Sequence, residues 1–274
     1  MSSPMCDSDY KYVATAEVES FVERCMIAVG TDPHHSNALA QVLREADYRG
    51  HVSHGLNRLE IYVRDIKNGM MQGQGEPSIE KETGSTALVN GNNLLGPVVG
   101  NFCMDLAIKK AKEHGIGWVV CKGWYSSRAL QHGIIPSIGT NPLAVAAPAK
   151  AGDSFQLDMA TSATALGKVE MSRRKEIEIP LGWGVNSKGK GHCFVAVNPQ
   201  MFADGFEDRM QCLLDQYRNL QPAEGESAVL VAGDPERTHM RRVEGEGGIR
   251  YHVNLLRAMD ELADTLGVAH LPTM

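Results

Sequence analysis

Residues 49–62 read RGHVSHGLNRLEIY, and this stretch decides how the rest of the chain is interpreted. Ser53 is a favourable N-cap residue, and no helix-breaking residue follows before the exit at residues 67–69, so we expect a helix to begin at Ser53. In that helix His54, Arg58 and Tyr62 stand at positions i, i+4 and i+8, which share one face. The spacing therefore predicts a face that carries an imidazole, a guanidinium and a phenol.

These side chains suit a small acid whose oxygen gains or loses a proton. Histidine exchanges protons near neutral pH, and arginine grips a planar carboxylate with two parallel hydrogen bonds. From spacing alone another interpretation stays open. The stretch would then be an ordinary surface helix whose Arg58 pairs with Glu60 or Asp65.

A family resemblance favours the catalytic interpretation. Residues 47–62 follow the pattern Asp-Tyr-Arg-Gly-His-x-Ser-His-Gly-x-x-Arg-x-x-x-Tyr. The pattern resembles the N-terminal signature of the type-2 malate/L-lactate dehydrogenases, NAD(P)-dependent oxidoreductases that lack a Rossmann fold. The resemblance implies that His54 is the proton donor and that Ser53, Arg58 and Tyr62 are substrate-side residues. It also implies a homodimer.

Composition sets outer limits on function. The chain has 274 residues, 43% of them hydrophobic, and a net charge of -6 with scattered basic residues, which argues against nucleic acid as a partner. We expect no membrane span and no signal peptide, because no apolar run is long enough. Six cysteines without a Cys-x-x-Cys pair predict free thiols in a reducing compartment, and hence a cytoplasmic protein.

We expect a mixed α/β (α+β) fold of the non-Rossmann malate/L-lactate dehydrogenase type, with an N-terminal helical lobe. The predicted regions are a mobile lead (1–14), a helical lobe with the Ser-His-Gly motif (15–80), a shortened cofactor-binding α/β region (81–240) and a C-terminal helical segment that packs back on the core (241–274). Within them we expect helices at 15–28, 36–48, 101–114, 206–220 and 253–266, the third ended by Gly115 or Gly117. Apolar spacing predicts buried faces on three of these helices: Val18, Phe21, Val22, Cys25 and Met26 on the first, Ala38, Leu39, Val42 and Leu43 on the second, and Met210, Leu213, Leu214 and Tyr217 on the fourth. Asp47 and Glu45, near the end of the second helix, are expected to be solvated or paired with Arg49. Strands are expected at 86–89, 116–121, 143–148, 155–159, 192–197 and 228–232, and residues 69–83 are expected to be a linker.

The predicted cofactor site lies where the strand at 155–159 ends. Small and hydroxyl residues follow it and lead toward a helix N-terminus, where free N–H groups favour phosphate or sugar oxygens. Plain helix capping would explain the same residues, but they match the cofactor segment of the family, as does a loop at 233–235. The resemblance implies NAD or NADP bound by Asp158, Met159, Ala160, Thr161, Ser162, Ala163, Thr164, Gly233, Asp234 and Pro235.

The resemblance breaks at three places. The Asn-His-aromatic-Gly motif of the family is missing after Gly123, a strand and loop are missing near residues 135–137, and a long insertion is missing where Lys190-Gly191 meets His192. The flanking residues match well, so the breaks look like skipped segments. Segments missing from a core leave apolar surface uncovered, at a cost of about 25 cal/mol per Å². A native domain has a free energy of unfolding of only about 5–15 kcal/mol, so on the order of a few hundred Å² of uncovered surface is enough to exhaust it.

The sequence therefore predicts an NAD(P)-dependent oxidoreductase that transfers a hydride between nicotinamide and a small 2-hydroxy or 2-oxo acid, without a metal. The alternative is a catalytically inactive short isoform that serves as a scaffold or dimerisation partner. A hydrolase or metal enzyme fits poorly, because there is no Gly-x-Ser-x-Gly and His51-x-x-His54 lacks further ligands. The particular acid, and NAD against NADP, stay open.

Overall fold

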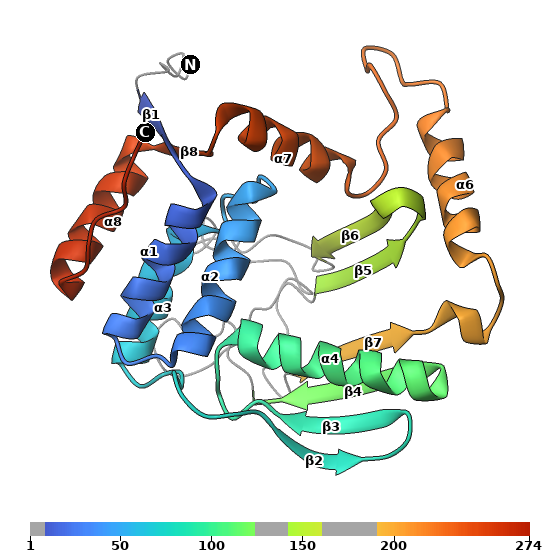
Figure 1. The fold of residues 1–274 in the computed structure, drawn as a ribbon, viewed down its shortest axis with the longest axis horizontal. Helices are drawn as coiled ribbons and strands as arrows, with labels where there is room; N and C mark the ends of the chain where they lie inside the picture. Colours follow the sequence, from blue (N-terminus) through green and yellow to red (C-terminus); the bar gives the residue numbers. More distant parts are fainter. Residues whose placement is uncertain (1–8, 124–141, 161–190) are drawn as a thin grey trace, which may run out of the picture.

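The structure, a computed structural model, describes residues 9–123, 142–160 and 191–274 (Figure 1). It has the expected mixed α/β character, and the first three helices and the last one lie together, with the strands beside them. The predicted helix that follows the strand at 155–159 lies outside the described residues, as do residues 1–8 of the lead.

The helical lobe is built from α1 (Thr15–Ala28), α2 (Pro33–Tyr48) and α3 (Leu59–Lys67), the last preceded by the short 3-10 helix η2 (Leu56–Arg58). Asp32 caps α2 by accepting a 2.8 Å hydrogen bond from the His34 N–H, which starts the helix at Pro33. The predicted apolar stripe of α1 is confirmed, since its members are fully buried: Val18, Phe21, Val22, Cys25 and Met26. On α2 one prediction is wrong, because Val42 is 45% exposed.

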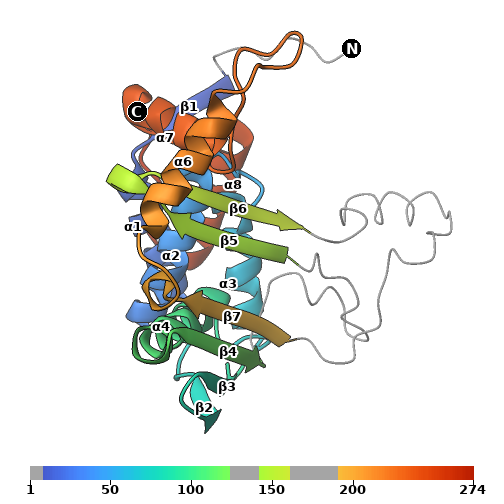
Figure 2. The same cartoon turned by 90° about the vertical axis from the view of Figure 1, so that its right-hand side faces the viewer.

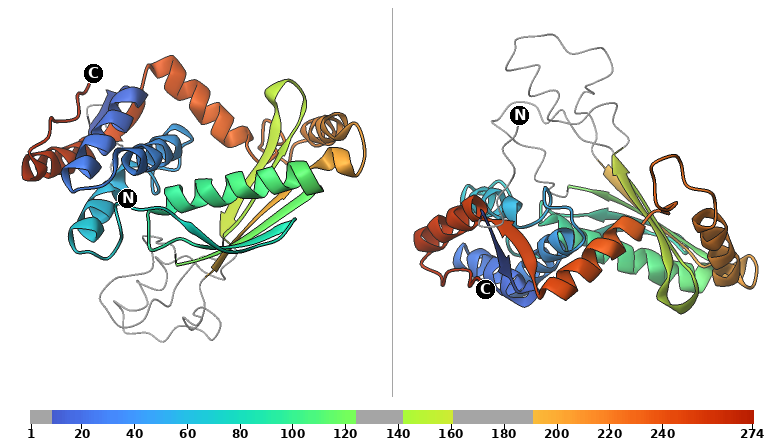
Figure 3. Two further views of the ribbon diagram at one scale, coloured as in Figure 1. Left: turned by 60° about the horizontal axis from the view of Figure 1, so that its bottom comes forward. Right: turned by 90° about the horizontal axis from the view of Figure 1, so that it is seen from above.

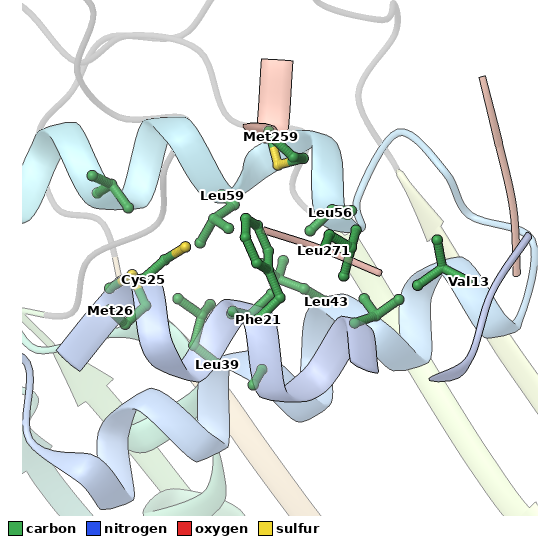
Figure 4. Close-up of a cluster of buried hydrophobic side chains, with 14 of the residues drawn as sticks. Val13, Phe21, Cys25, Met26, Leu39, Leu43, Leu56, Leu59, Met259 and Leu271 are labelled. Carbon is green, nitrogen blue, oxygen red and sulfur yellow. The ribbon is translucent and has the colours of Figure 1, made fainter. Parts of the chain in front are cut away.

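The C-terminal segment completes the core of the helical lobe. Strand β1 (Tyr10–Val13) pairs antiparallel with β8 (Ile249–His252), and α8 (Val253–Leu266) follows. Residues 10–13 are therefore a strand, and the prediction of a mobile lead through residue 14 is wrong there. Figure 4 shows side chains from α1, α2, α3 and α8 meeting in one cluster, which includes Phe21, Leu39, Leu59 and Met259.

A four-stranded sheet forms the second part of the fold, in the order β2-β3-β4-β7. Its strands are β2 (Ser78–Glu82), β3 (Thr86–Asn90), β4 (Ile116–Lys122) and β7 (Gly191–Val197). Helix α4 (Gly96–His114) connects the parallel pair β3 and β4 and packs on one face. Two boundaries differ from prediction: the linker at 69–83 contains β2, and α4 begins at Gly96 because Pro97 fits a first helical turn.

The sheet is buried on one face only. Residues of β4 alternate, and Val119 and Cys121 are fully buried under α4, whereas Trp118 and Val120 are 50% and 39% exposed. Val195 pairs with Trp118 in register and shares its exposed face. The apolar residues at 116–121 predict a buried strand, and the structure buries that strand on one face only.

A separate hairpin of β5 (Pro142–Pro148) and β6 (Ser154–Ala160) lies next to β7, and Figures 2 and 3 show its strands aligned with β7 and β4. Short 3-10 helices, η3 (Lys150–Gly152) and η4 (Pro199–Met201), lie at the turn of the hairpin and after β7. Helix α6 (Phe206–Arg218) packs on the hairpin through the buried Leu214. Leu213 and Tyr217, predicted to face inward, are 39% and 47% exposed.

Residues 228–232 were predicted to form a strand, and this is wrong. They run beside β6, but a single hydrogen bond, from the Gln156 N–H to the Ala232 carbonyl (3.1 Å), joins the two segments, and Leu230 is 60% exposed. Helix α7 (Asp234–Glu246), which the sequence analysis missed, follows at once and crosses the predicted boundary at residue 240. Among the described helices none is long and apolar enough to cross a membrane.

Candidate active site

The Ser-His-Gly motif forms an exposed turn, and the expected helix start at Ser53 is wrong. Gly55 has a non-helical backbone (φ -95°, ψ -140°), η2 begins at Leu56 and α3 begins at Leu59. The physical reason is the buried Asp47 of α2. Its carboxylate accepts the Leu56 N–H at 2.7 Å, which fixes where the helical backbone can begin.

The turn nevertheless brings the predicted residues Ser53, His54 and Arg58 together. The Ser53 Oγ lies 2.8 Å from the His54 Nδ1, and the Arg58 Nε–H donates to the Ser53 carbonyl at 2.6 Å. Among the described residues, the terminal Nη atoms of Arg58 make no hydrogen bond, so its outer fork can receive a carboxylate. A serine hydroxyl that accepts from Nδ1–H leaves Nε2 as the atom of His54 that exchanges a proton.

Tyr62 lies one turn beyond Arg58, in α3. Its ring is half-buried and packs against the core of the helical lobe. The separation of four residues places Tyr62 and Arg58 on the same side of the helix start. Its part in a site stays a prediction.

Asp47 is a residue that the sequence analysis misjudged. Its position at the end of α2 predicts a carboxylate that is solvated or paired with Arg49, but Asp47 is 1% exposed and also accepts a 2.6 Å hydrogen bond from the Tyr251 hydroxyl. Burial raises the pKa of the Asp47 carboxyl to about 6, despite these hydrogen bonds and the nearby His239. The predicted pairing holds for its neighbour, since the Arg49 Nε lies 2.6 Å from the Glu45 carboxylate.

Arg49 also connects the motif to the predicted cofactor strand. Its Nη1 donates to the Gln156 Oε1 of β6 at 2.7 Å, and the Gln156 N–H in turn reaches the Ala232 carbonyl just before α7. The sequence did not predict this contact between Arg49 and Gln156, because it spans 107 residues. These two hydrogen bonds thus link the three segments in which site residues were predicted.

The first turns of α7 make further contacts with the motif and with β6. The His51 Nε2 lies 3.4 Å from the Glu236 carboxylate, and the His239 Nδ1–H donates to the Tyr48 carbonyl at 3.0 Å. The Arg237 guanidinium donates to the Ser154 carbonyl of β6 at 3.2 Å. Figure 1 shows α7 running from the helical lobe toward the β5–β6 hairpin, so it joins both halves of the candidate site.

Asp158 lies on the side of β6 that faces the motif. Side chains alternate along a strand, so Asp158 points to the same side as Gln156, the partner of Arg49. The residues paired with them on β5 are Ala144 and Ala146, which leave room above that face. Asp158 and Met159 are exposed, Ala160 ends the strand, and the predicted contacts of Thr161, Ser162, Ala163 and Thr164 lie outside the described residues.

The predicted loop at 233–235 is the start of α7. Gly233, with φ +102°, precedes the helix, and Asp234 and Pro235 form its first turn. The Asp234 carboxylate accepts from the Val231 N–H, Arg218 and Arg237. Burial alone would raise its pKa, but these hydrogen bonds hold the pKa of Asp234 well below its usual range. Asp234 therefore anchors α7. Gly233 is buried beside the Arg237 guanidinium, and Pro235 is the exposed residue of this loop.

Comparison with known proteins places the chain in a family. The family model described as malate/L-lactate dehydrogenase matches residues 13–135, 126–191 and 186–260. The chain therefore belongs to the malate/L-lactate dehydrogenase family, as its motifs predicted. The matched segments overlap at 126–135 and 186–191, next to the predicted breaks near residues 135–137 and after Gly191.

Similar proteins carry related names. The chain is 39% identical over 210 residues to a malate dehydrogenase of Pyrococcus abyssi, an alignment that covers 67% of this chain and 58% of that enzyme. It is 29% identical to a malate/(S)-sulfolactate dehydrogenase of Methanothermus fervidus, covering 93% and 98% of the two chains. That alignment runs over 338 positions, more than the 274 residues of this chain, so parts of the relative have no counterpart here.

Solved structures agree in fold. The structure of malate dehydrogenase from Pyrococcus horikoshii OT3 matches with a TM-score of 0.85 and 26% identity, over 98% of this chain and 99% of that chain. Sulfolactate dehydrogenase from Methanocaldococcus jannaschii matches with a TM-score of 0.78 and 25% identity, over 94% and 98%. The non-Rossmann fold expected from the sequence is thus confirmed.

Proposed function

We propose that the chain is an NAD(P)-dependent oxidoreductase acting on a small 2-hydroxy or 2-oxo acid of the malate or lactate kind. The observation that carries the proposal is the contact chain from Arg49 through Gln156 to Ala232, which holds the Ser-His-Gly turn beside the predicted cofactor strand. Family membership supports the reaction class, because the relatives named above are malate and sulfolactate dehydrogenases.

In this mechanism the side chains of the turn handle the acid. Arg58 receives the substrate carboxylate on its outer Nη groups, while its Nε stays bound to the Ser53 carbonyl. His54 gives a proton from Nε2 to the C2 oxygen during reduction and takes it back during oxidation. Ser53 keeps the imidazole oriented through Nδ1 in both protonation states. Tyr62 is assigned a supporting hydrogen bond to the substrate.

A bound nicotinamide supplies or accepts the hydride. Asp158 fits such a cofactor because its carboxylate is exposed on the face above Ala144 and Ala146, where it can accept from ribose hydroxyls. Met159, Ala160 and residues 161–164 follow Asp158 in the sequence, and we assign them to the same cofactor site together with Gly233, Asp234 and Pro235. We propose NAD or NADP as the cofactor, since both present the same nicotinamide and ribose to these residues.

We also propose a homodimer in the cytoplasm. The family resemblance supports the dimer. The compartment is supported by the cysteines, because Cys103 and Cys121 are buried side by side as free thiols, and those at positions 25, 193 and 212 are free as well. The inactive scaffold considered above is not carried forward, because the comparisons offer no support for it.

The test is titration of the purified chain with NADH and with NADPH, followed by nicotinamide fluorescence beside a melting curve. Saturable binding that raises the melting temperature is expected, and a panel with oxaloacetate, pyruvate and sulfopyruvate then identifies the acid. A chain that melts cooperatively but binds neither cofactor would overturn the proposed function.

A further inference from the structure

The turn that carries His54 is exposed, so something outside it must hold its shape. Side chains 51–54 are exposed, and the helix cap expected from Ser53 is absent. The anchors lie at the end of α2: the His51 N–H donates to the Ala46 carbonyl at 2.7 Å, and the Gly50 N–H donates to the Asp47 carbonyl at 3.0 Å. The turn therefore begins beside Asp47, at the end of α2, and ends beside it again at Leu56, whose N–H donates to the Asp47 carboxylate.

Asp47 also contacts the residue that follows His54. A Cβ atom built on Gly55 would lie 1.9 Å from the Asp47 Oδ1, so only glycine permits this approach. Among the described residues Oδ1 has no hydrogen-bond partner, and it packs against the Gly55 backbone. One carboxylate thus fixes two consecutive residues, Gly55 by contact and Leu56 by hydrogen bond.

Tyr251 ties the same carboxylate to a distant part of the chain. Its hydroxyl donates to the Asp47 Oδ2 at 2.6 Å, the oxygen that also accepts the Leu56 N–H, and its side chain is 3% exposed. Tyr251 belongs to β8, which is paired with β1 and set in the core of the helical lobe. The Tyr251 hydroxyl therefore restrains the Asp47 carboxylate, and through it the turn, relative to the core of the helical lobe.

We propose that Asp47 and Tyr251 are positioning residues for His54. Neither touches the acid; they act by holding residues 55 and 56, and through them the backbone of His54, in one geometry. The inference rests on the proposed function for the role of His54, but the geometry that it assigns to the turn is independent of any reaction. Carboxylate charge matters as well as shape, because hydrogen bonds to an ionised acceptor are the stronger ones.

Several charged and titratable groups lie near Asp47 and can influence its protonation. His239 of α7 faces it, and a pocket of about 360 Å³ borders it, lined also by Tyr10, Val52, Arg242, Val243, Glu246, Ile249 and Arg250. Arg242 is paired with Glu246, and Arg250 stacks on the Tyr10 ring. A substitution at position 47 must therefore be compared with one that changes charge elsewhere.

The experiment uses the full chain with Asp47→Asn and Tyr251→Phe. Three quantities are measured: kcat and KM for reduction of oxaloacetate by NADH, hydrogen exchange of the Leu56 amide, and the NMR titration of the His54 imidazole. Asp47→Asn is expected to lower kcat about tenfold and to speed Leu56 exchange about tenfold, the effect of weakening one hydrogen bond to a charged acceptor. Tyr251→Phe, which keeps the packing, is expected to have a smaller effect of about fivefold. The affinity for NADH should change less than about twofold in both, since neither residue borders the predicted cofactor segment.

Matched controls are Asp105→Asn, on the outer side of α4, and Tyr217→Phe, on the exposed side of α6, both of which should behave as the unsubstituted chain. Unchanged Leu56 exchange and an unchanged His54 titration in Asp47→Asn would overturn the positioning role. If the unsubstituted chain does not reduce oxaloacetate, the proposed function fails, while the exchange and titration measurements still decide the role of Asp47. Should Asp47→Asn not fold, Tyr251→Phe decides by the same measurements.

Discussion

Because the Asp47 carboxylate is buried, its contribution to the free energy of unfolding should fall as the pH rises, the opposite of what a salt-bridged carboxylate does. Burial raises the pKa of the carboxyl from its ordinary value of 3.8 to about 6 in the folded protein. A difference of about 2 pKa units corresponds to about 3 kcal/mol, at about 1.4 kcal/mol per unit. Asp47→Asn keeps the shape of the side chain but cannot ionise. We therefore expect it to abolish this pH-dependent contribution to the free energy of unfolding.

The sign follows from which state holds the proton more tightly. Because the folded pKa is the higher one, the folded chain binds the proton between about pH 4 and pH 6 while the unfolded chain has already lost it. The contribution of Asp47 to the free energy of unfolding is therefore greatest below about pH 4, and it falls by about 3 kcal/mol as the pH rises through 6. Asp153 acts in the opposite sense at lower pH, because the hydrogen bond from Arg218 holds the pKa of that carboxyl at about 2.

The assay is urea unfolding of the unsubstituted chain and of Asp47→Asn between about pH 4 and pH 7. Their difference isolates Asp47, because the remaining carboxylates contribute equally to both. The stability of Asp47→Asn relative to the unsubstituted chain should rise by about 3 kcal/mol across the interval. Parallel plots of the free energy of unfolding against pH for the two chains would refute the reasoning. They would mean that Asp47 keeps an ordinary pKa and that the turn does not bury it. Asp105→Asn, an exposed carboxylate, serves as the control and should leave the curve parallel.

Other substitutions test separate parts of the structure. His54→Ala should lower turnover by about 100-fold or more and leave NADH binding nearly unchanged, and equal loss of both would make His54 structural. Arg58→Lys, which loses the planar fork, should raise KM for the oxo acid by about tenfold in steady-state assays while NADH binding is unchanged. Gly117→Ala places a Cβ 1.9 Å from the Ala107 carbonyl and should destabilise by about 1–3 kcal/mol in urea, whereas Gly245→Ala, in open space on α7, should stabilise by up to about 1 kcal/mol.

Local patterns were enough to predict most helices and strands. The stripe of α1 was read correctly from residues three and four apart, and the end of α4 from Gly115, whose φ of +84° suits a helix terminus. Failures occur where long-range contacts decide. Residues 10–13 are polar in part and form a strand only because β8 lies beside them, and residues 228–232 lack a full partner and stay irregular.

In the candidate site, too, local spacing allowed correct predictions, and residues held by long-range contacts were missed. The spacing of His54 and Arg58 was informative even though the helix begins later, because a 3-10 turn followed by α3 still places them near each other around Ser53. Asp47 was misjudged for a physical reason, since a charged residue at the end of an amphipathic helix is normally solvated. Its burial depends on Tyr251, 204 residues away, which no local pattern reveals.

Two of the breaks in the family resemblance, after Gly123 and after Gly191, fall at one edge of the structure. Lys122, the last residue of β4, pairs with Gly191, the first of β7, and Pro142 pairs with Ala160 at the matching end of the hairpin. Figure 2 shows these strand ends on the same side of the molecule. Shortening at that edge leaves the ladders intact and keeps the two buried faces packed, so it touches the core less than removal of segments from the middle of a strand would. The same edge holds Asp158 and the start of the predicted cofactor segment. The cost of the missing segments should therefore appear first in the affinity for nicotinamide cofactors and only second in stability, and comparing NADH affinity with the midpoint of urea unfolding separates the two.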